Sequence, residues 1–137
     1  MIVEKQRHKS DCMLACVAMA VGRPYEELWP EEFQQEVAEA GCNDKRDERA
    51  LGIAGLTKDV DYRAVCMQVT ANEFRLRQML WGRRAILQVP SLNYERGQHA
   101  VYWDGATLHD PSNLQVYRWL DHCGTINWVW IFNERTS

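Results

Sequence analysis

The amino-acid sequence predicts an α+β fold, in which N-terminal helices pack on a C-terminal antiparallel sheet. Helical patterns dominate the first half of the chain, whereas short runs rich in Val, Ile, Trp and Tyr dominate the second. The 137 residues include 46% hydrophobic side chains and six tryptophans, which supply enough apolar material for one packed core. Because no repeat, low-complexity tract or linker divides the chain, we expect residues 1–137 to form a single domain.

The first helix is expected in the almost wholly apolar segment of residues 11–21. It stops at Gly22, a residue type that commonly follows a helix. Asp11 or Ser10 is expected to cap its start, because a short side-chain oxygen there accepts hydrogen bonds from the free amides of the first turn. Cys12 then lies in that first turn.

A short helical piece and a second helix are expected next. The second helix should run from about residue 31 to residue 40, with acidic residues in its first turn and Gly41 after its last. Residues 42–50 carry charges of alternating sign, which predicts a solvated loop that leads into another helix.

The second half of the chain begins with a strand at residues 62–69. Thr70 and Glu73 have the spacing of a capping box, so a helix is expected over residues 71–81. Further strands are expected in three runs rich in β-branched and aromatic residues, at 84–90, 98–112 and 126–133.

Charge and cysteine content narrow the class of protein. A net charge of −3 without a long Lys/Arg run argues against a nucleic-acid partner. No apolar stretch approaches the roughly 18 residues of a membrane span, and the N-terminus lacks the apolar core of a signal peptide. We therefore expect a cytoplasmic protein that makes no membrane contact. An odd number of cysteines, five, argues against a disulfide framework and favours free thiols, and no cofactor is expected.

The most informative stretch is HAVYWDGATLHD, at residues 99–110. Asp-Gly between two alternating apolar runs is a strong signal for a hairpin with a two-residue turn, here Asp104–Gly105. That turn makes His99 and Asp110 direct cross-strand neighbours, with Cβ atoms about 4.5–5.5 Å apart. A carboxylate on one ring nitrogen of a histidine fixes the tautomer and leaves the other nitrogen free to act as a base.

Cys12 is the candidate nucleophile for this histidine. A helix N-terminus and a nearby protonated histidine both favour the thiolate form of a cysteine, which is the reactive form. The sequence therefore predicts a catalytic site made of Cys12, His99 and Asp110.

Structural roles are the alternative for every residue of this kind. A cysteine is more often a small buried hydrophobe than a nucleophile, which is the role expected of Cys16, Cys42, Cys66 and Cys123. The histidines expected to be structural are His8, His109 and His122. Asp110 precedes Pro111 and can equally begin a turn.

A zinc site is a further alternative. Its ligands would come from Cys12, Cys16, His99, His109 and the His122–Cys123 pair. No Cys-x-x-Cys spacing anchors such a site, so the catalytic interpretation is favoured.

A longer pattern links these residues to a known family. Gln6 is followed by five residues and then by Cys12 within DCMLACVAM, and His-Ala-Val and Asp-Pro come later in the chain. The pattern resembles the bacteriocin-processing peptidase family of papain-like cysteine proteases, over residues 6–111. These peptidases cleave after the double glycine of leader peptides, usually as the N-terminal part of an ABC exporter. Because no membrane domain or ATPase follows here, we expect a stand-alone member.

The resemblance implies a papain-like fold and a role for each residue. Cys12 would be the nucleophile, His99 the general base and acid, and Asp110 the residue that orients the imidazole. Gln6 would help to form the oxyanion hole, together with the backbone amide of Cys12 at the helix start. Family members commonly have Gly directly after the cysteine, where this chain has Met13.

The function expected from these residues is that of a cysteine peptidase, which hydrolyses a peptide or protein substrate through a thioester at Cys12. A pocket for small residues such as Gly is implied by the resemblance alone. Deamidation and acyl transfer would use the same residues, and the sequence leaves them open, as it does the oligomeric state. The alternatives from other classes are a catalytically silent papain-like domain that binds a peptide or protein partner, and a metal-binding regulatory protein.

Overall fold

The computed structural model describes residues 3–8, 11–90, 98–120 and 123–132, and it combines helices with an antiparallel sheet, which confirms the predicted α+β class. The helical elements are α1 (Cys12–Val21), α2 (Tyr25–Leu28), α3 (Glu31–Ala40), α4 (Asp44–Ala54), the 3₁₀ turn η1 (Thr70–Asn72) and α5 (Glu73–Leu80). The strands are β1 (Lys58–Gln68), β2 (Ala85–Pro90), β3 (Gln98–Trp103), β4 (Leu108–His109), β5 (Val116–Tyr117) and β6 (Thr125–Phe132).

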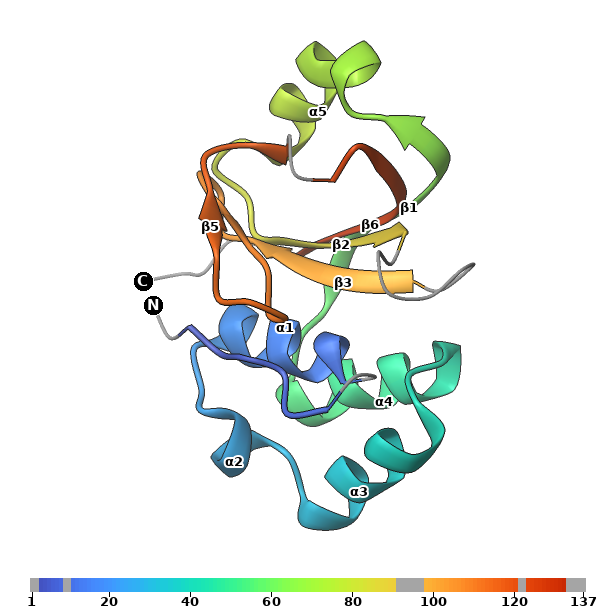
Figure 1. Ribbon diagram of the computed structural model, residues 1–137, viewed down its shortest axis with the longest axis vertical. Coiled ribbons are helices and arrows are strands. Elements are labelled where there is room, and N and C mark those ends of the chain that lie inside the picture. Colours follow the sequence, from blue (N-terminus) through green and yellow to red (C-terminus); the bar gives the residue numbers. More distant parts are fainter. Residues whose placement is uncertain (1–2, 9–10, 91–97, 121–122, 133–137) are drawn as a thin grey trace.

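The strands form a six-stranded sheet in the order β1-β6-β2-β3-β4-β5, in which all neighbouring pairs are antiparallel. Figure 1 shows helices α1 to α4 on one side of this sheet and α5 on the other. The helices within residues 12–54 therefore cover one face of a sheet whose strands lie within residues 58–132, close to the predicted division of the chain.

Each face of the sheet carries its own hydrophobic cluster. Successive residues of a strand point to opposite faces, so β3 contributes to both clusters. Ala100 and Tyr102 join the cluster that contains α1, whereas Val101 and Trp103 join the cluster that contains Leu76 and Leu80 of α5. β3 therefore lies between the two clusters. Its first two residues, Gln98 and His99, are more exposed than the four that follow.

Helix α1 is the central helix of the first cluster. All of its residues except Val21 are buried, which matches its nearly unbroken apolar sequence. Gly22 follows it in the left-handed conformation with φ 70°, and its N–H donates to Ala18 O, so the predicted end of this helix is confirmed. Packing on all sides holds the start of α1, and with it Cys12, in a fixed position against the sheet.

The predicted solvated loop over residues 42–50 is wrong, because α4 already begins at Asp44. The Asn43 side chain caps this helix by accepting a hydrogen bond of 2.8 Å from the backbone N–H of Arg46. Ala50 and Leu51 are buried, so an apolar stripe anchors a helix whose other faces are charged.

Smaller differences concern the elements on either side of α5. The predicted capping box does not form, because Thr70 lies in η1 and α5 begins at Glu73 without a side-chain capping hydrogen bond. β1 begins at Lys58 rather than at residue 62, and the short strand β5 was not predicted.

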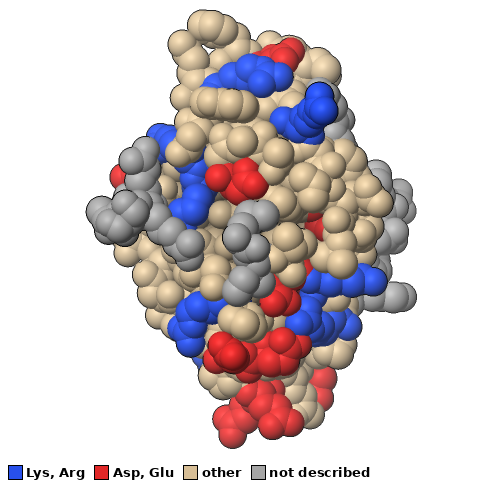
Figure 2. Space-filling view, turned by 90° about the vertical axis from the view of Figure 1, so that its left-hand side faces the viewer, with Lys and Arg blue, Asp and Glu red and all other residues tan. Residues whose placement is uncertain are grey.

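Surface charge is unevenly distributed. Figure 2 shows acidic side chains gathered at the lower end of the visible face, the end at which Figure 1 places α2 and α3. The first turns of these helices carry the exposed residues Glu26, Glu27, Glu31 and Glu32.

None of the helices in the described part of the chain has both the length and the apolar character that crossing a membrane requires.

Candidate active site

The hairpin that joins β3 to β4 has a different register from the predicted one. Trp103 pairs with Leu108, so residues 104–107 join the strands instead of the predicted Asp-Gly pair alone. The predicted direct cross-strand pairing of His99 with Asp110 is therefore wrong.

The side chain of Asp104 explains this longer turn. Its Oδ1 accepts hydrogen bonds from the backbone N–H groups of Ala106 (2.9 Å) and Thr107 (2.7 Å). Aspartate favours the first position of a turn because it can accept from the backbone beyond it in this way. Gly105 has φ +107°, and a Cβ there would lie 3.3 Å from the carbonyl carbon of Gly82, so glycine suits this position.

His99 and Asp110 nevertheless form a pair, with 2.8 Å between His99 Nε2 and Asp110 Oδ1. The observed register differs from the predicted one by two residues, and an even shift leaves each side chain on its original face of the sheet. Asp110 follows β4 as a diagonal neighbour of His99, and an imidazole ring can span that separation. The predicted contact is present, although its geometry differs from the predicted one.

Asp110 is buried and holds several hydrogen bonds at once. Its Oδ1 also accepts from the backbone N–H (2.9 Å) and the hydroxyl (2.7 Å) of Ser112. Burial raises the pKa of Asp110, but the hydrogen bonds from His99 and Ser112 outweigh burial and lower the pKa below its usual range. The turn expected at Pro111 is also present. Asp110 therefore begins a turn, and its ionised carboxylate also holds the His99 imidazole.

His99 carries a positive charge at neutral pH. Burial lowers the pKa of His99, but hydrogen bonds with Asp110 and Cys12 outweigh burial and raise the pKa to about 9. Because Nε2 is bonded to Asp110, Nδ1 is the ring nitrogen left to face the Cys12 thiol. The ring is therefore placed between a carboxylate and a thiol.

Cys12 is the first residue of α1 and is only 8% exposed. Its Sγ accepts a hydrogen bond of 3.3 Å from the backbone N–H of Ala100, the residue after His99. The start of α1 is thereby held against the start of β3. The Cys12 sulfur therefore lies at a helix start and beside the His99 imidazole.

Asp11 occupies the N-cap position of α1, as predicted, but its side chain does not make the expected capping hydrogen bond. Its carboxylate accepts hydrogen bonds from the backbone N–H groups of Arg7 (3.1 Å) and His8 (2.9 Å) and from the hydroxyl of Tyr25 (2.6 Å). Because the Asp11 carboxylate is fully buried, it needs hydrogen-bond donors from the protein. It finds two of them in the backbone of the preceding segment. Ser10, the other predicted cap, lies outside the described residues. In the first turn of α1, the backbone N–H of Met13 bonds to the Cys42 thiol and that of Leu14 donates to Asp11 O at 3.0 Å.

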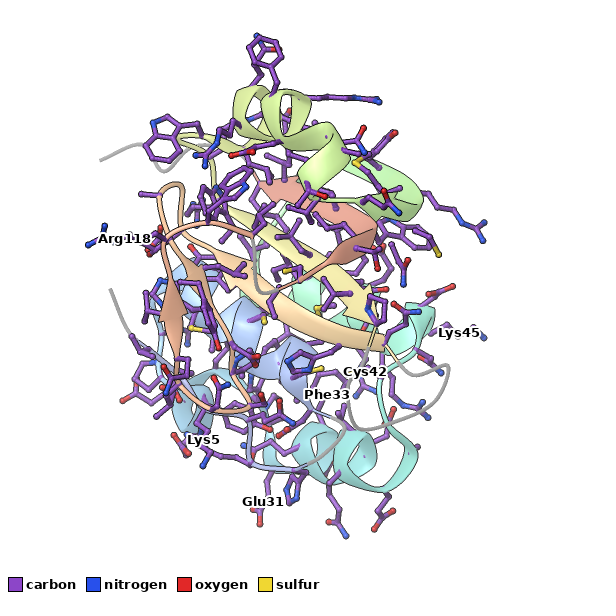
Figure 3. The ribbon with its side chains drawn as sticks, turned by 45° about the horizontal axis from the view of Figure 1, so that its top comes forward. Lys5, Glu31, Phe33, Cys42, Lys45 and Arg118 are labelled. Atoms are coloured by element: carbon purple, nitrogen blue, oxygen red, sulfur yellow. The ribbon has the colours of Figure 1, made fainter. Side chains whose placement is uncertain are left out.

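A cavity of about 350 Å³ opens beside Cys12 and His99. Its walls come from the start of α1, the segment that leads into α4, and the facing parts of β2 and β3. Figure 3 shows Cys42, one of its lining residues, between the helices and the sheet. Cys42 and Asp47 also line this cavity, and sequence reasoning missed both, because only the packing of α4 against α1 brings them there.

Gln6 does not reach this cavity. Its Nε2 donates to the backbone carbonyl of His8 at 2.7 Å, its Oε1 is buried without a partner, and Gln6 is not among the residues that line the cavity. Its backbone N–H donates to Pro111 O at 2.9 Å, which ties the N-terminal segment to the turn after Asp110. One N–H of the Gln6 amide is thus used by the His8 carbonyl, and the oxyanion-hole role expected of Gln6 stays a prediction.

The remaining cysteines have different surroundings. None of the five cysteines, all of which lie in the described part of the chain, forms a disulfide, as predicted. Cys16 is fully buried as predicted, whereas Cys66 is exposed in an irregular part of β1, which contradicts the prediction for it. Within the described ranges there is no group of three or more His, Cys, Asp or Glu side chains that could hold a metal ion. His122, one residue of the zinc alternative, lies outside those ranges.

Comparisons with known proteins add no family to this geometry. No protein-family model matches the chain, and no curated protein matches it.

Proposed function

We propose that this protein is a cysteine peptidase with a papain-like arrangement of Cys12, His99 and Asp110. The observation that supports the proposal most strongly is the shared cavity. Cys12 and His99 both line it, and Asp110 holds the His99 ring at 2.8 Å from the opposite side. A nucleophile, a base and a residue that orients the base are thus placed beside a space that a substrate can enter.

The reaction follows from the charges of these groups. The Cys12 thiolate attacks the carbonyl carbon of a peptide bond, a C–S bond forms, and the carbonyl oxygen becomes an oxyanion. When the oxyanion collapses, the C–N bond breaks and the His99 imidazolium gives its proton to the departing amine. A water molecule, deprotonated by His99, then attacks the thioester, so that an acid is released and the thiol is restored.

Stabilisation of the oxyanion falls to the start of α1. The backbone N–H of Cys12, at the first position of this helix, would be one donor to the oxyanion. Gln6 does not line the cavity, so its side chain would have to move to supply a second donor. Removal of one oxyanion donor commonly costs about 10²- to 10³-fold in rate.

Alkylation of each cysteine by iodoacetamide, followed against pH with peptide mapping, tests the proposal. Cys66 is the internal reference, because it is an exposed thiol of the same chain. We expect Cys12 to react faster than Cys66 at pH 6–7 although it is only 8% exposed, and His99→Ala to remove that advantage. A Cys12 that reacts no faster than Cys66 and ignores His99 would contradict the proposal.

A silent domain that binds a peptide or protein is the second candidate function. The observation that favours it is the Gln6 amide, which is held by His8 instead of facing the cavity. Hydrolysis of activated Gly-containing acyl substrates separates the two candidates. Turnover that is lost in Cys12→Ala supports the peptidase, whereas saturable binding of peptides without turnover supports the binding domain.

A further inference from the structure

The cavity beside Cys12 has an acidic end. Asp44 and Asp47, both in the first turn of α4, line it together with the Asn43 cap. Asp44 is exposed at the rim, whereas Asp47 is only 4% exposed. The remaining polar residues of the cavity wall include the neutral Gln88 and Gln98.

Asp47 is a buried carboxylate that lacks full compensation. Its Oδ1 is buried and has no hydrogen-bond partner, while the Cys42 thiol bonds to the carboxylate. Burial, and then the negative charge of Asp44, raises the pKa of Asp47 to about 7. A buried carboxylate of this kind is stabilised by a cation or by a strong hydrogen-bond donor.

The basic side chains nearby are directed elsewhere. Arg46 and Arg49 form ion pairs with Glu36, at 2.9 and 3.1 Å. Lys58 bonds to Glu48 and Asp61, and its positive charge lowers the pKa of Asp47 by less than burial and the charge of Asp44 raise it. Among the described residues, no Lys or Arg therefore lines the cavity.

Figure 3 shows the same arrangement for the labelled residues. Lys45, at the start of α4, points outward from the molecule, away from Cys42. Lys5 and Arg118 lie on the opposite side of the view. None of these three cations is placed to neutralise the acidic end of the cavity.

From this geometry we infer that the Asp47 end of the cavity is a specificity subsite for a basic side chain of the substrate, Lys or Arg, close to the bond that Cys12 attacks. The inference rests on the proposed peptidase function. One continuous cavity of about 350 Å³ contains Cys12 and Asp47, so one peptide can contact both. Met13 and Ala100 line the same cavity and offer apolar surface to the methylene stem of such a side chain.

Peptidyl acyloxymethyl ketones, which label an active cysteine covalently, are the probes that test this inference. Matched probes carry Lys, norleucine or Glu at either of the two residues before the reactive group, with Gly at the other. Labelling of Cys12 is followed by intact mass in the wild type, Asp47→Asn and Glu32→Gln. Glu32 is exposed in the first turn of α3 and outside the cavity, so its variant removes the same charge without changing the subsite.

We expect the wild type to be labelled about 10- to 100-fold faster by a Lys probe than by its norleucine match, the range of a hydrogen bond to a charged group. The Glu probe should be slowest. Asp47→Asn should bring the Lys and norleucine rates together, and Glu32→Gln should keep the wild-type ratio. If Asp47→Asn does not fold, which a melting curve reveals, the wild-type ratios still test the subsite.

The outcomes distinguish the inference from the proposed function. Equal labelling by Lys, norleucine and Glu probes in the wild type would overturn the subsite and leave the peptidase intact. A Lys preference that survives Asp47→Asn would also overturn it. If no probe labels Cys12, the proposed function fails and the subsite fails with it.

Discussion

Two histidine–aspartate pairs lie within one hairpin, and they differ in what surrounds the histidine. In the first pair, His99 Nε2 lies 2.8 Å from Asp110, and in the second, His109 Nε2 lies 2.8 Å from Asp104. The His99 side chain is 18% exposed and lines the cavity with Cys12, whereas the His109 side chain is 5% exposed. His109 Nδ1 is buried without a hydrogen-bond partner.

The second pair belongs to the turn. Asp104 Oδ2 also accepts from the Thr107 hydroxyl at 2.6 Å, and the His109 ring lies 6.0 Å from the ring of Tyr102. A hydrogen bond between histidine and aspartate is therefore not enough by itself to mark a candidate catalytic base. What differs is the second ring nitrogen, which must face a nucleophile and a space for substrate.

Replacing each histidine by alanine should give the largest difference between the two pairs. His99→Ala is expected to lower peptide hydrolysis by about 10²- to 10⁴-fold, the range for loss of a general acid and base. His109→Ala should leave alkylation of Cys12 within about twofold and cost roughly 1–3 kcal/mol of stability, because Asp104 loses a buried partner. Hydrolysis of activated acyl substrates measures the first effect, and alkylation rates with denaturant melts measure the second. Equal losses of Cys12 reactivity in the two variants would contradict the distinction.

Asp110→Asn should change how stability depends on pH. Burial lowers the pKa of His99, but its hydrogen bonds with Asp110 and Cys12 raise this pKa to about 9 in the folded protein. The stability that these bonds contribute is therefore complete below about pH 6.5 and is lost as pH rises toward 9. On the acid side, the lowered pKa of Asp110 makes its contribution disappear as pH falls below about 4.

The free energy of unfolding of the wild type should therefore exceed that of Asp110→Asn by roughly 1–3 kcal/mol near pH 5–6. The difference should be smaller at pH 9. Denaturant melts at several pH values measure this difference. His99→Ala is the matched background, because in it the alkaline loss should vanish. A difference between wild type and Asp110→Asn that is constant from pH 5 to 9 would show that His99 is not held in its charged form.

Gly105→Ala tests the turn between the pairs. With φ +107° and 3.3 Å from a new Cβ to the carbonyl carbon of Gly82, alanine should cost roughly 1–3 kcal/mol. Gly52→Ala in the interior of α4 is the control, since nothing lies within 4 Å of its Cβ, and it should stabilise by about 0.5–1 kcal/mol. Thermal melts compare them, and similar shifts in both variants would argue against strain at Gly105.

Ser112→Ala should have the smallest effect. It removes the 2.7 Å hydrogen bond from the hydroxyl to Asp110 but keeps the backbone one, so we expect a loss of about 0.5–1.5 kcal/mol. Alkylation of Cys12 should slow by only a few fold, because Asp110 still holds His99. A loss of reactivity as large as that of His99→Ala would mean that Ser112 positions the pair more tightly than this geometry indicates.

Local patterns predicted the elements whose causes lie within a few residues. The apolar run of α1 and the glycine after it mark that helix, and the aromatic runs mark β3 and β6. The prediction failed where one side chain can form either of two local hydrogen-bond patterns. Asp104 can occupy the first or second position of a turn, and Asp11 can cap forward or accept from the preceding backbone. Neighbours distant in sequence, such as Gly82 and Tyr25, bear on those choices.

The sequence by itself determined the class of the fold, the helix that begins at Cys12, and the contact between His99 and Asp110. That contact survives a wrong register because side chains alternate with a period of two, and a shift by two residues preserves the face. Only the tertiary structure decided that Cys42 and Asp47 join Cys12 in one cavity. These positions depend on how α4 packs against α1, and no pattern of spacing encodes the packing of two elements that are far apart in the chain.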